Sequence, residues 1–152
     1  MALETAIILA AGEGTRMKSS LPKVLHTVAG RSLLGHVIHA VNQLQPSEVR
    51  VVVGAGREEV TAHLSQIAPK ATTVFQETRG GTGHAAQLAL ASKSPKGTVL
   101  ILAGDTPLLT ADSLKQFVDM HSKGKFAASV LSAEHSDPTG YGRIIRDDND
   151  EL

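Results

Sequence analysis

The sequence contains no cysteine among its 152 residues, which excludes disulfide bonds and thiolate metal ligands and fits a reducing compartment. It also carries no net charge, because 15 Lys and Arg residues balance 15 Asp and Glu residues. Proteins that bind nucleic acids or membrane surfaces usually carry a basic patch or run, and no such cluster is visible. We therefore expect no nucleic-acid partner and no membrane partner.

Long apolar runs are also missing. No stretch approaches the roughly 20 apolar residues that a transmembrane helix needs. The first residues lack the positively charged region and long apolar region of a secretory signal peptide. The sequence thus predicts a cytoplasmic protein.

Several common catalytic and phosphate-binding motifs are absent as well. Gly12 and Gly14 begin a G-x-G pattern, but Met17 stands where a dinucleotide-binding fingerprint needs its third glycine. No G-K-S/T follows at the spacing of a Walker A loop. No serine or cysteine lies in a nucleophile elbow, and His36 and His39 have no H-E-x-x-H context. A dinucleotide, a P-loop NTPase site, a covalent hydrolase and a histidine metal centre are all disfavoured.

Apolar runs and helical patterns alternate along the chain, which has the length of one domain with a substantial core. This alternation predicts an α/β fold, a Rossmann-like three-layer sandwich with a mostly parallel central sheet. Ligands bind such sheets at the carboxyl ends of the strands. The expected strands are residues 5–10, 48–53, 72–75, 98–102 and 126–132, and the expected helices are residues 32–44, 57–67, 82–93 and 110–122. A last strand is expected to begin at Arg143 without a successor, so we expect a truncated domain, a fragment of a longer protein.

A glycine-bearing loop follows the first expected strand. Gly12 and Gly14 are accompanied by two cations, Arg16 and Lys23, and Pro22 constrains the backbone just before the lysine. Backbone N–H groups of such a loop can converge on phosphate oxygens. The loop therefore indicates a phosphate site, although a tight β-to-α turn that needs glycine for backbone reasons alone remains an alternative.

Five segments, taken in order, resemble one enzyme superfamily. They read L-A-A-G-E-G-T-R-M from Leu9, P-K at 22–23, G-T-G-H-A from Gly81, G-D-T-P-L from Gly104 and D-P-T-G-Y-G-R-I from Asp137. The first segment resembles the signature of sugar-1-phosphate nucleotidyltransferases. The third and fifth segments resemble the uridyltransferase domain of the bacterial bifunctional N-acetylglucosamine-1-phosphate uridyltransferase/glucosamine-1-phosphate acetyltransferase family.

This resemblance implies that UTP and N-acetylglucosamine 1-phosphate react to UDP-N-acetylglucosamine and pyrophosphate, a step toward peptidoglycan. It implies Mg²⁺ as cofactor, held by Asp105, whereas an ordinary turn aspartate is the alternative. By the resemblance Arg16 and Lys23 are catalytic, Arg16 at the leaving phosphates and Lys23 at the α-phosphate. The implied substrate-binding residues are Leu9, Ala10, Ala11, Gly12, Gly14, Thr15, Gln76, Gly81, Thr82, Gly104 and Gly140.

Within this set, Gln76 is expected to read uracil, because a carboxamide offers both a donor and an acceptor to the base edge. Gly140 is expected to hold the acetamido sugar through its backbone. Arg79 and Gly80 depart from residues that related enzymes often show, and His84 lies beside the expected base-binding loop. A polar strand end followed by a glycine-rich helix start, with Thr82 as the cap, is the structural alternative for residues 76–82.

The resemblance covers an N-terminal part of a pyrophosphorylase domain, residues 1–152. The family's second metal ligand, an asparagine, is expected beyond Leu152, and so are a glutamate and an asparagine that contact the sugar. The family also trimerises through a C-terminal β-helix acetyltransferase domain that this sequence lacks. Two alternatives stay open: a transferase for another sugar or base, and an inactive nucleotide-binding fragment.

Overall fold

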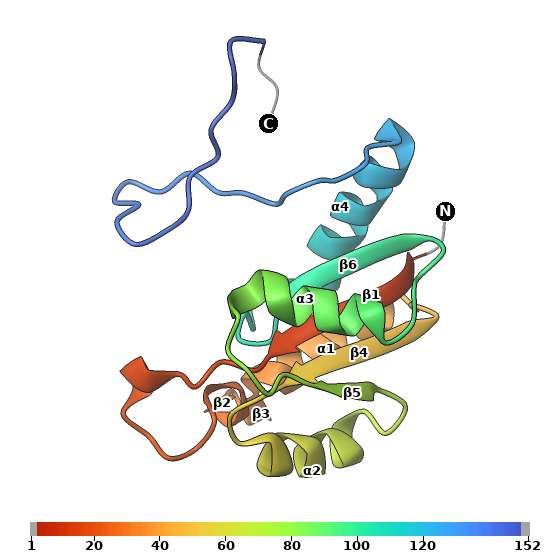
Figure 1. The fold of residues 1–152 in the computed structure, drawn as a ribbon. Coiled ribbons are helices and arrows are strands. Elements are labelled where there is room, and N and C mark those ends of the chain that lie inside the picture. Colours follow the sequence, from red (N-terminus) through yellow and green to blue (C-terminus); the bar gives the residue numbers. More distant parts are fainter. Residues whose placement is uncertain (1–2, 150–152) are drawn as a thin grey trace.

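The computed structural model describes residues 3–149, whose centre is a parallel sheet of four strands (Figure 1). The strands lie in the order β5-β4-β1-β6, so that the first strand occupies an inner position. Their bounds are β1 Leu3–Ala10, β4 Glu48–Val53, β5 Thr72–Phe75 and β6 Thr98–Ala103. The expected mostly parallel sheet is confirmed.

Helices cover both faces of this sheet, as the alternation of side chains along β1 requires. Ile8 faces the cluster that includes residues of α1, α2 and α4, whereas Ile7 packs with Ala85 and Ala89 of α3. In Figure 1, α3 lies in front of the sheet and α1 behind it. The helix bounds are α1 Leu33–Gln43, α2 Arg57–Ile67, α3 Gly81–Ala91 and α4 Ala111–Gly124.

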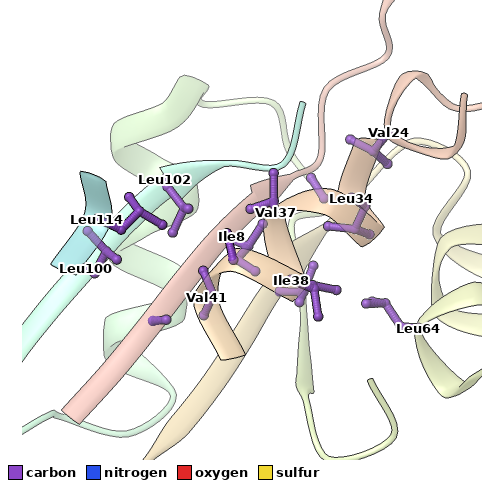
Figure 2. Packing of buried hydrophobic residues seen from close by; sticks show 14 of the residues in the cluster. Ile8, Val24, Leu34, Val37, Ile38, Val41, Leu64, Leu100, Leu102 and Leu114 are labelled. Carbon is purple, nitrogen blue, oxygen red and sulfur yellow. The ribbon is translucent and has the colours of Figure 1, made fainter. Parts of the chain in front are cut away.

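The larger core lies between the sheet and helices α1, α2 and α4. Figure 2 shows Ile8 of β1 against Val37 and Val41 of α1, with Leu64 approaching from α2 and Leu102 from β6. Burying one such aliphatic side chain stabilises the fold by about 1.5–3 kcal/mol. This core keeps the ends of β1 and β6 side by side. The loops that follow these two strands therefore also begin side by side.

The strand order contains one reversal. From β1 the chain steps outward to β4 and β5, then returns past β1 to β6, with α3 on the opposite face. In open parallel sheets, such a reversal opens a crevice beyond the carboxyl ends of the strands. The crevice here lies beyond Ala10 and Ala103, the last residues of β1 and β6.

Two expected helix caps are confirmed. Ser32 Oγ accepts a hydrogen bond of 2.9 Å from the backbone N–H of Gly35 at the start of α1. Thr110 Oγ1 accepts one of 3.2 Å from Ser113 at the start of α4. The alternative cap at Thr82 is wrong, because α3 already begins at Gly81 and Gly80 occupies the cap position.

Two expected strands are also wrong. Residues 126–132 and the segment from Arg143 to residue 149 contain no regular secondary structure, and this part of the chain runs away from the sheet (Figure 1). A strand persists only where its backbone groups pair with another strand. Residues 129–131 do pass beside β6, yet within residues 3–149 the backbone of β6 pairs only with β1.

A short hairpin was not expected from the sequence. Strands β2, Thr27–Val28, and β3, Arg31–Ser32, pair antiparallel across Ala29 and Gly30, which both have positive φ. Two one-turn 3₁₀ helices precede it, η1 at Thr15–Met17 and η2 at Lys23–Leu25. Among residues 3–149, no helix has the length and apolar character needed to cross a membrane.

Candidate functional site

A cavity of about 530 Å³ opens at the crevice where the strand order reverses. It is built by the loop after β1, by η2, by the β5–α3 connection and by the end of β6. Its lining comprises Leu9, Ala10, Ala11, Gly12, Glu13, Gly14, Thr15, Lys23, Val24, Gln76, Arg79, Gly81, Thr82, Ala85, Ala103 and Asp105. The first turn of α3 thus meets the glycine loop across one cavity.

The glycine loop is held against the stem of Lys23. Gly14 has φ +64°, a left-handed conformation that L side chains rarely adopt. A Cβ at Gly14 would also lie 2.5 Å from Lys23 Cβ, closer than two such atoms ever approach. Glycine is therefore required at residue 14 on two grounds, its backbone conformation and its distance from Lys23.

Lys23 reaches across the cavity to Asp105, which follows β6. The Lys23 Nζ and Asp105 Oδ2 atoms are 2.5 Å apart, and the two side chains are 34% and 28% exposed. Both charges are therefore accessible from the cavity rather than sealed in the core. This pair places one cation and one carboxylate beside the glycine loop.

Gln76 forms the opposite wall. Its backbone N–H continues the β5–β4 ladder with a 2.8 Å hydrogen bond to the carbonyl of Val53. Its side chain is only 8% exposed, and the Nε2 atom donates to the carbonyl of Gly81 at 3.1 Å. The same Nε2 lies 3.2 Å from Nδ1 of His84. The carboxamide is thus oriented before any ligand binds.

A second ion pair joins two walls of the cavity. Arg79, on the β5–α3 connection, pairs with Glu13 of the glycine loop. The side chains are 68% and 36% exposed, so water screens the pair and its contribution to stability is small. The pair nevertheless links the glycine loop to the β5–α3 connection across the cavity.

The donor set around Asp105 fits a magnesium ion better than a transition metal. Residues 3–149 contain no group of three or more His, Cys, Asp or Glu side chains that could hold a metal. Mg²⁺ needs no such protein cage, because it is commonly held by one or two carboxylates together with substrate phosphates and water. A single accessible carboxylate beside a phosphate-type loop matches that chemistry.

Residues 6–152 match the MobA-like NTP transferase domain family. The chain belongs to this NTP transferase family.

Among curated NTP transferase relatives, the bifunctional protein GlmU of Streptomyces coelicolor is 51% identical over 143 residues. GlmU of Thermobifida fusca is 53% identical over 146 residues. Each alignment covers 93% of this chain and 30% of the relative, so the chain spans about a third of their length.

Among solved structures, a nucleotidyl transferase from Methanothermobacter thermautotroptrophicus superimposes with a TM-score of 0.67 at 22% identity. That match covers 78% of this chain and 58% of the other. At this identity the likeness concerns the fold, and it agrees with the strand order described above.

Most of the site residues predicted from the sequence meet at the NTP transferase cavity. Leu9, Ala10, Ala11, Gly12, Gly14, Thr15, Lys23, Gln76, Gly81, Thr82 and Asp105 all line it. They come from the end of β1 and the chain that follows it, from the β5–α3 connection with the first turn of α3, and from the residues after β6. Their convergence is a consequence of strand order, since the carboxyl ends of parallel strands share one edge.

Three predicted residues do not line the cavity. Arg16 lies in η1, one residue beyond Thr15, with its side chain exposed. Gly104 lies behind the wall, where its N–H donates to the carbonyl of Leu9 at 2.8 Å. Gly140 is in the irregular segment that follows α4 and is not among the described residues that line the cavity.

Sequence reasoning did not assign a role to Glu13. No local pattern identifies it, because its partner Arg79 is distant in sequence and reaches it only through the fold. The contact between Gln76 and His84 was likewise not foreseen. The only sequence signal for His84 is its place beside the expected base-binding loop, directly before Ala85 of the cavity wall.

Proposed function

We propose that this chain carries the nucleotide half of a uridyltransferase site and transfers UMP from UTP to N-acetylglucosamine 1-phosphate. The observation that carries the proposal is the Lys23–Asp105 pair, accessible from a cavity that also contains a glycine loop and a preoriented carboxamide. Relatives about 50% identical bear the name of a bifunctional GlmU protein, which supports the choice of substrates.

The base occupies the wall formed by Gln76 and the first turn of α3. A uracil edge presents one N–H donor between two carbonyl acceptors, which a carboxamide and nearby backbone groups can satisfy. Gln76 supplies the carboxamide, and Gly81 and Thr82 supply backbone groups in the same cavity wall. This half of the site selects the nucleotide.

The reaction needs no nucleophile from the protein. A phosphate oxygen of the sugar 1-phosphate attacks the α-phosphorus of UTP, a new P–O bond forms, and the bond to the β-phosphate oxygen breaks in line. Pyrophosphate leaves with the electron pair of that bond. The protein contributes positioning and neutralisation of charge, the two main sources of catalysis in phosphoryl transfer.

Lys23 and the glycine loop neutralise and hold the phosphates. The Lys23 ammonium releases Asp105 and shifts its charge toward the α-phosphate, which it can reach from the cavity wall. Backbone N–H groups of residues 12–15 face the triphosphate. Arg16 follows Thr15 directly, and its long exposed side chain binds the leaving β- and γ-phosphates that extend beyond the cavity.

Magnesium fits Asp105. Asp105 would hold the ion, which would supply positive charge beside the phosphates in addition to that of Lys23 and Arg16. The carboxylate that pairs with Lys23 would be its protein ligand.

A nucleotide-binding fragment without turnover is the second candidate. It is favoured by the place of Gly140, the proposed contact to the acetamido sugar, outside the cavity. In that case UTP binds and no pyrophosphate is released.

Pyrophosphate release with N-acetylglucosamine 1-phosphate, Mg²⁺ and each of the four NTPs tests the proposal, beside calorimetric titration with UTP. Release that depends on UTP and disappears in Asp105→Ala supports the transferase. UTP binding without release supports the binding fragment. Neither binding nor release, from protein shown by circular dichroism to be folded, overturns both. Release with ATP, CTP or GTP instead of UTP identifies a nucleotidyltransferase for another base.

A further inference from the structure

The side chain of Gln76 is locked in one of its two amide orientations. The carbonyl of Gly81 can only accept a hydrogen bond, so the Gln76 atom 3.1 Å from it must be the amino group. The second N–H of that group points at Nδ1 of His84, 3.2 Å away, which accepts when the imidazole carries its proton on Nε2. Both donors are consumed inside the protein. Only the carbonyl oxygen, Oε1, is left for a ligand.

Gly80 makes room for the imidazole that holds this orientation. A Cβ added at Gly80 would lie 2.6 Å from Cβ, Cγ and Nδ1 of His84. Gly80 has φ −93° and ψ 11°, a conformation that alanine adopts without strain. Glycine is therefore needed here for the space that His84 fills, and not for its backbone freedom.

We propose that His84 is a positioning residue that makes the base pocket selective for a pyrimidine with a ring N–H. The inference rests on the proposed function, because it concerns the same cavity wall. His84 acts through Gln76: it holds the amino group away from the ligand and leaves Oε1 as the single group that faces the base.

The two common pyrimidines differ at the ring atom that meets Oε1. Uracil has a donor at N3, which the oxygen accepts, whereas cytosine has an acceptor there and repels it. To bind cytosine, the carboxamide must turn over, which would bring Oε1 against the Gly81 carbonyl and, in the tautomer with the proton on Nε2, against His84 Nδ1 as a second acceptor. Each such conflict leaves a polar group unpaired, at a cost that corresponds to about a tenfold change in affinity.

Calorimetric titration of the full chain with UTP and with CTP, both with Mg²⁺, measures this selectivity as the ratio of the two dissociation constants. His84→Leu keeps much of the side chain's volume but removes the acceptor. In this variant we expect the dissociation constant of CTP divided by that of UTP to fall by about five- to tenfold, mainly because CTP binds more tightly than to the wild-type chain. His84→Asn offers a carbonyl oxygen near the position of Nδ1, and we expect it to restore most of the selectivity.

Two glycine variants separate positioning from general damage to α3. Gly80→Ala displaces His84 and should lower the ratio as His84→Leu does. Gly83→Ala is the matched control on the same helix, because a Cβ there meets nothing within 4 Å. Its ratio should equal that of the wild-type chain.

The possible results separate a failure of the role proposed for His84 from a failure of the proposed function. A wild-type chain that binds no UTP overturns the proposed function. A wild-type chain that prefers UTP, together with an unchanged ratio in folded His84→Leu, overturns the role of His84 and leaves the function standing. Loss of selectivity in His84→Asn as complete as in His84→Leu also overturns it, since the restored acceptor would then have no effect.

Discussion

At the scale of single residues, the site depends on charges that compensate each other before a ligand arrives. Lys23 and Asp105 come from different connections and meet at 2.5 Å beside the cavity. Each neutralises the other, so neither has to stand alone in a partly desolvated place. The pair thus places a cation and a carboxylate, the groups that the proposed function needs for phosphate and for magnesium, beside one cavity.

Asp105→Asn should therefore abolish catalysis and spare the fold. We expect pyrophosphate release to fall at least about 100-fold, since one preorganised charge commonly contributes that much. The melting temperature should change little, because Asp105 is partly exposed and lies outside the core. Asp119→Asn on the exposed face of α4 is the matched control. Turnover of the Asp105→Asn variant above a tenth of the wild-type value would contradict the role proposed for Asp105.

Gly14→Ala tests how the glycine loop is held. The substitution puts a Cβ 2.5 Å from Lys23 Cβ and forces alanine to a φ of +64°. We expect UTP affinity to fall at least tenfold and stability by about 1–2 kcal/mol, the usual cost of a left-handed non-glycine residue. Calorimetry and urea unfolding measure the two effects. Gly142→Ala, where a Cβ meets nothing, should change neither; equal effects in the two variants would contradict the packing of the loop against Lys23.

At the scale of elements, helix α3 connects the cavity wall to a buried guanidinium. Its first turn lines the cavity, and carbonyls in and just after its last turn accept hydrogen bonds from that guanidinium. Arg50, 1% exposed on β4, donates to the carbonyls of Ala89 at 2.5 Å and Lys93 at 2.7 Å. Glu48 accepts a third hydrogen bond from Arg50 at 2.8 Å. This network sets α3 against the sheet and thereby supports the base wall.

The same network makes stability depend on pH. The hydrogen bond from Arg50, supported by the charges of Arg50 and Lys93, lowers the pKa of Glu48 below its usual 4.5. A lowered carboxyl pKa stabilises the fold above the unfolded value, and the contribution disappears as pH falls through the folded value. We expect Glu48→Gln to cost about 1–3 kcal/mol at pH 7 and progressively less below pH 4.5.

Urea unfolding of wild type and Glu48→Gln at pH 7 and pH 3 checks this. Glu58→Gln, in the first turn of α2 and exposed, is the control for loss of a carboxylate. A difference between wild type and Glu48→Gln that is the same at both pH values would show that the charge of Glu48 does not support Arg50.

At the scale of the whole molecule, the lining of the cavity falls within residues 9–105. It comes from β1 and the glycine loop, η2, the β5–α3 connection, the start of α3 and the end of β6, whereas residues 133–149 are almost wholly exposed and contribute nothing to it. The exposed part includes Tyr141 at 68% and Ile145 at 79%. The proposed nucleotide site and the proposed sugar contact at Gly140 therefore lie in different parts of the chain.

Deletion of residues 133–152 separates the two functions. We expect UTP affinity within about twofold of wild type, because no cavity residue and little buried apolar surface are lost. Binding of N-acetylglucosamine 1-phosphate to the nucleotide-bound chain should disappear if Gly140 holds the sugar. Calorimetry measures both, with Gly140→Ala in the full chain as a point-variant control. A large loss of UTP affinity in the deletion variant would contradict the proposal that nucleotide binding does not involve residues 133–152.

Strands and helices with strong local patterns were predicted closely. The bounds of β4, β5 and α2 coincide with the expected residues 48–53, 72–75 and 57–67. Each is an apolar or amphipathic run between turn residues, and such runs fix the backbone through local preferences. Residues 126–132 carry a similar apolar pattern through Val130 and Leu131, but a strand also needs a partner. Whether a partner strand lies beside residues 126–132 depends on the tertiary fold and not on their own apolar pattern.

The sequence by itself determined the class of fold, the helix caps at Ser32 and Thr110 and the chemical kinds of group in the site, because these follow from short-range constraints on backbone and side chains. Only the tertiary structure decided which groups meet. The pairs Lys23–Asp105 and Glu13–Arg79 join connections that the strand order β5-β4-β1-β6 brings to one edge. The physical reason is that charge and hydrogen bonding act over a few ångströms in space, whatever the separation along the chain.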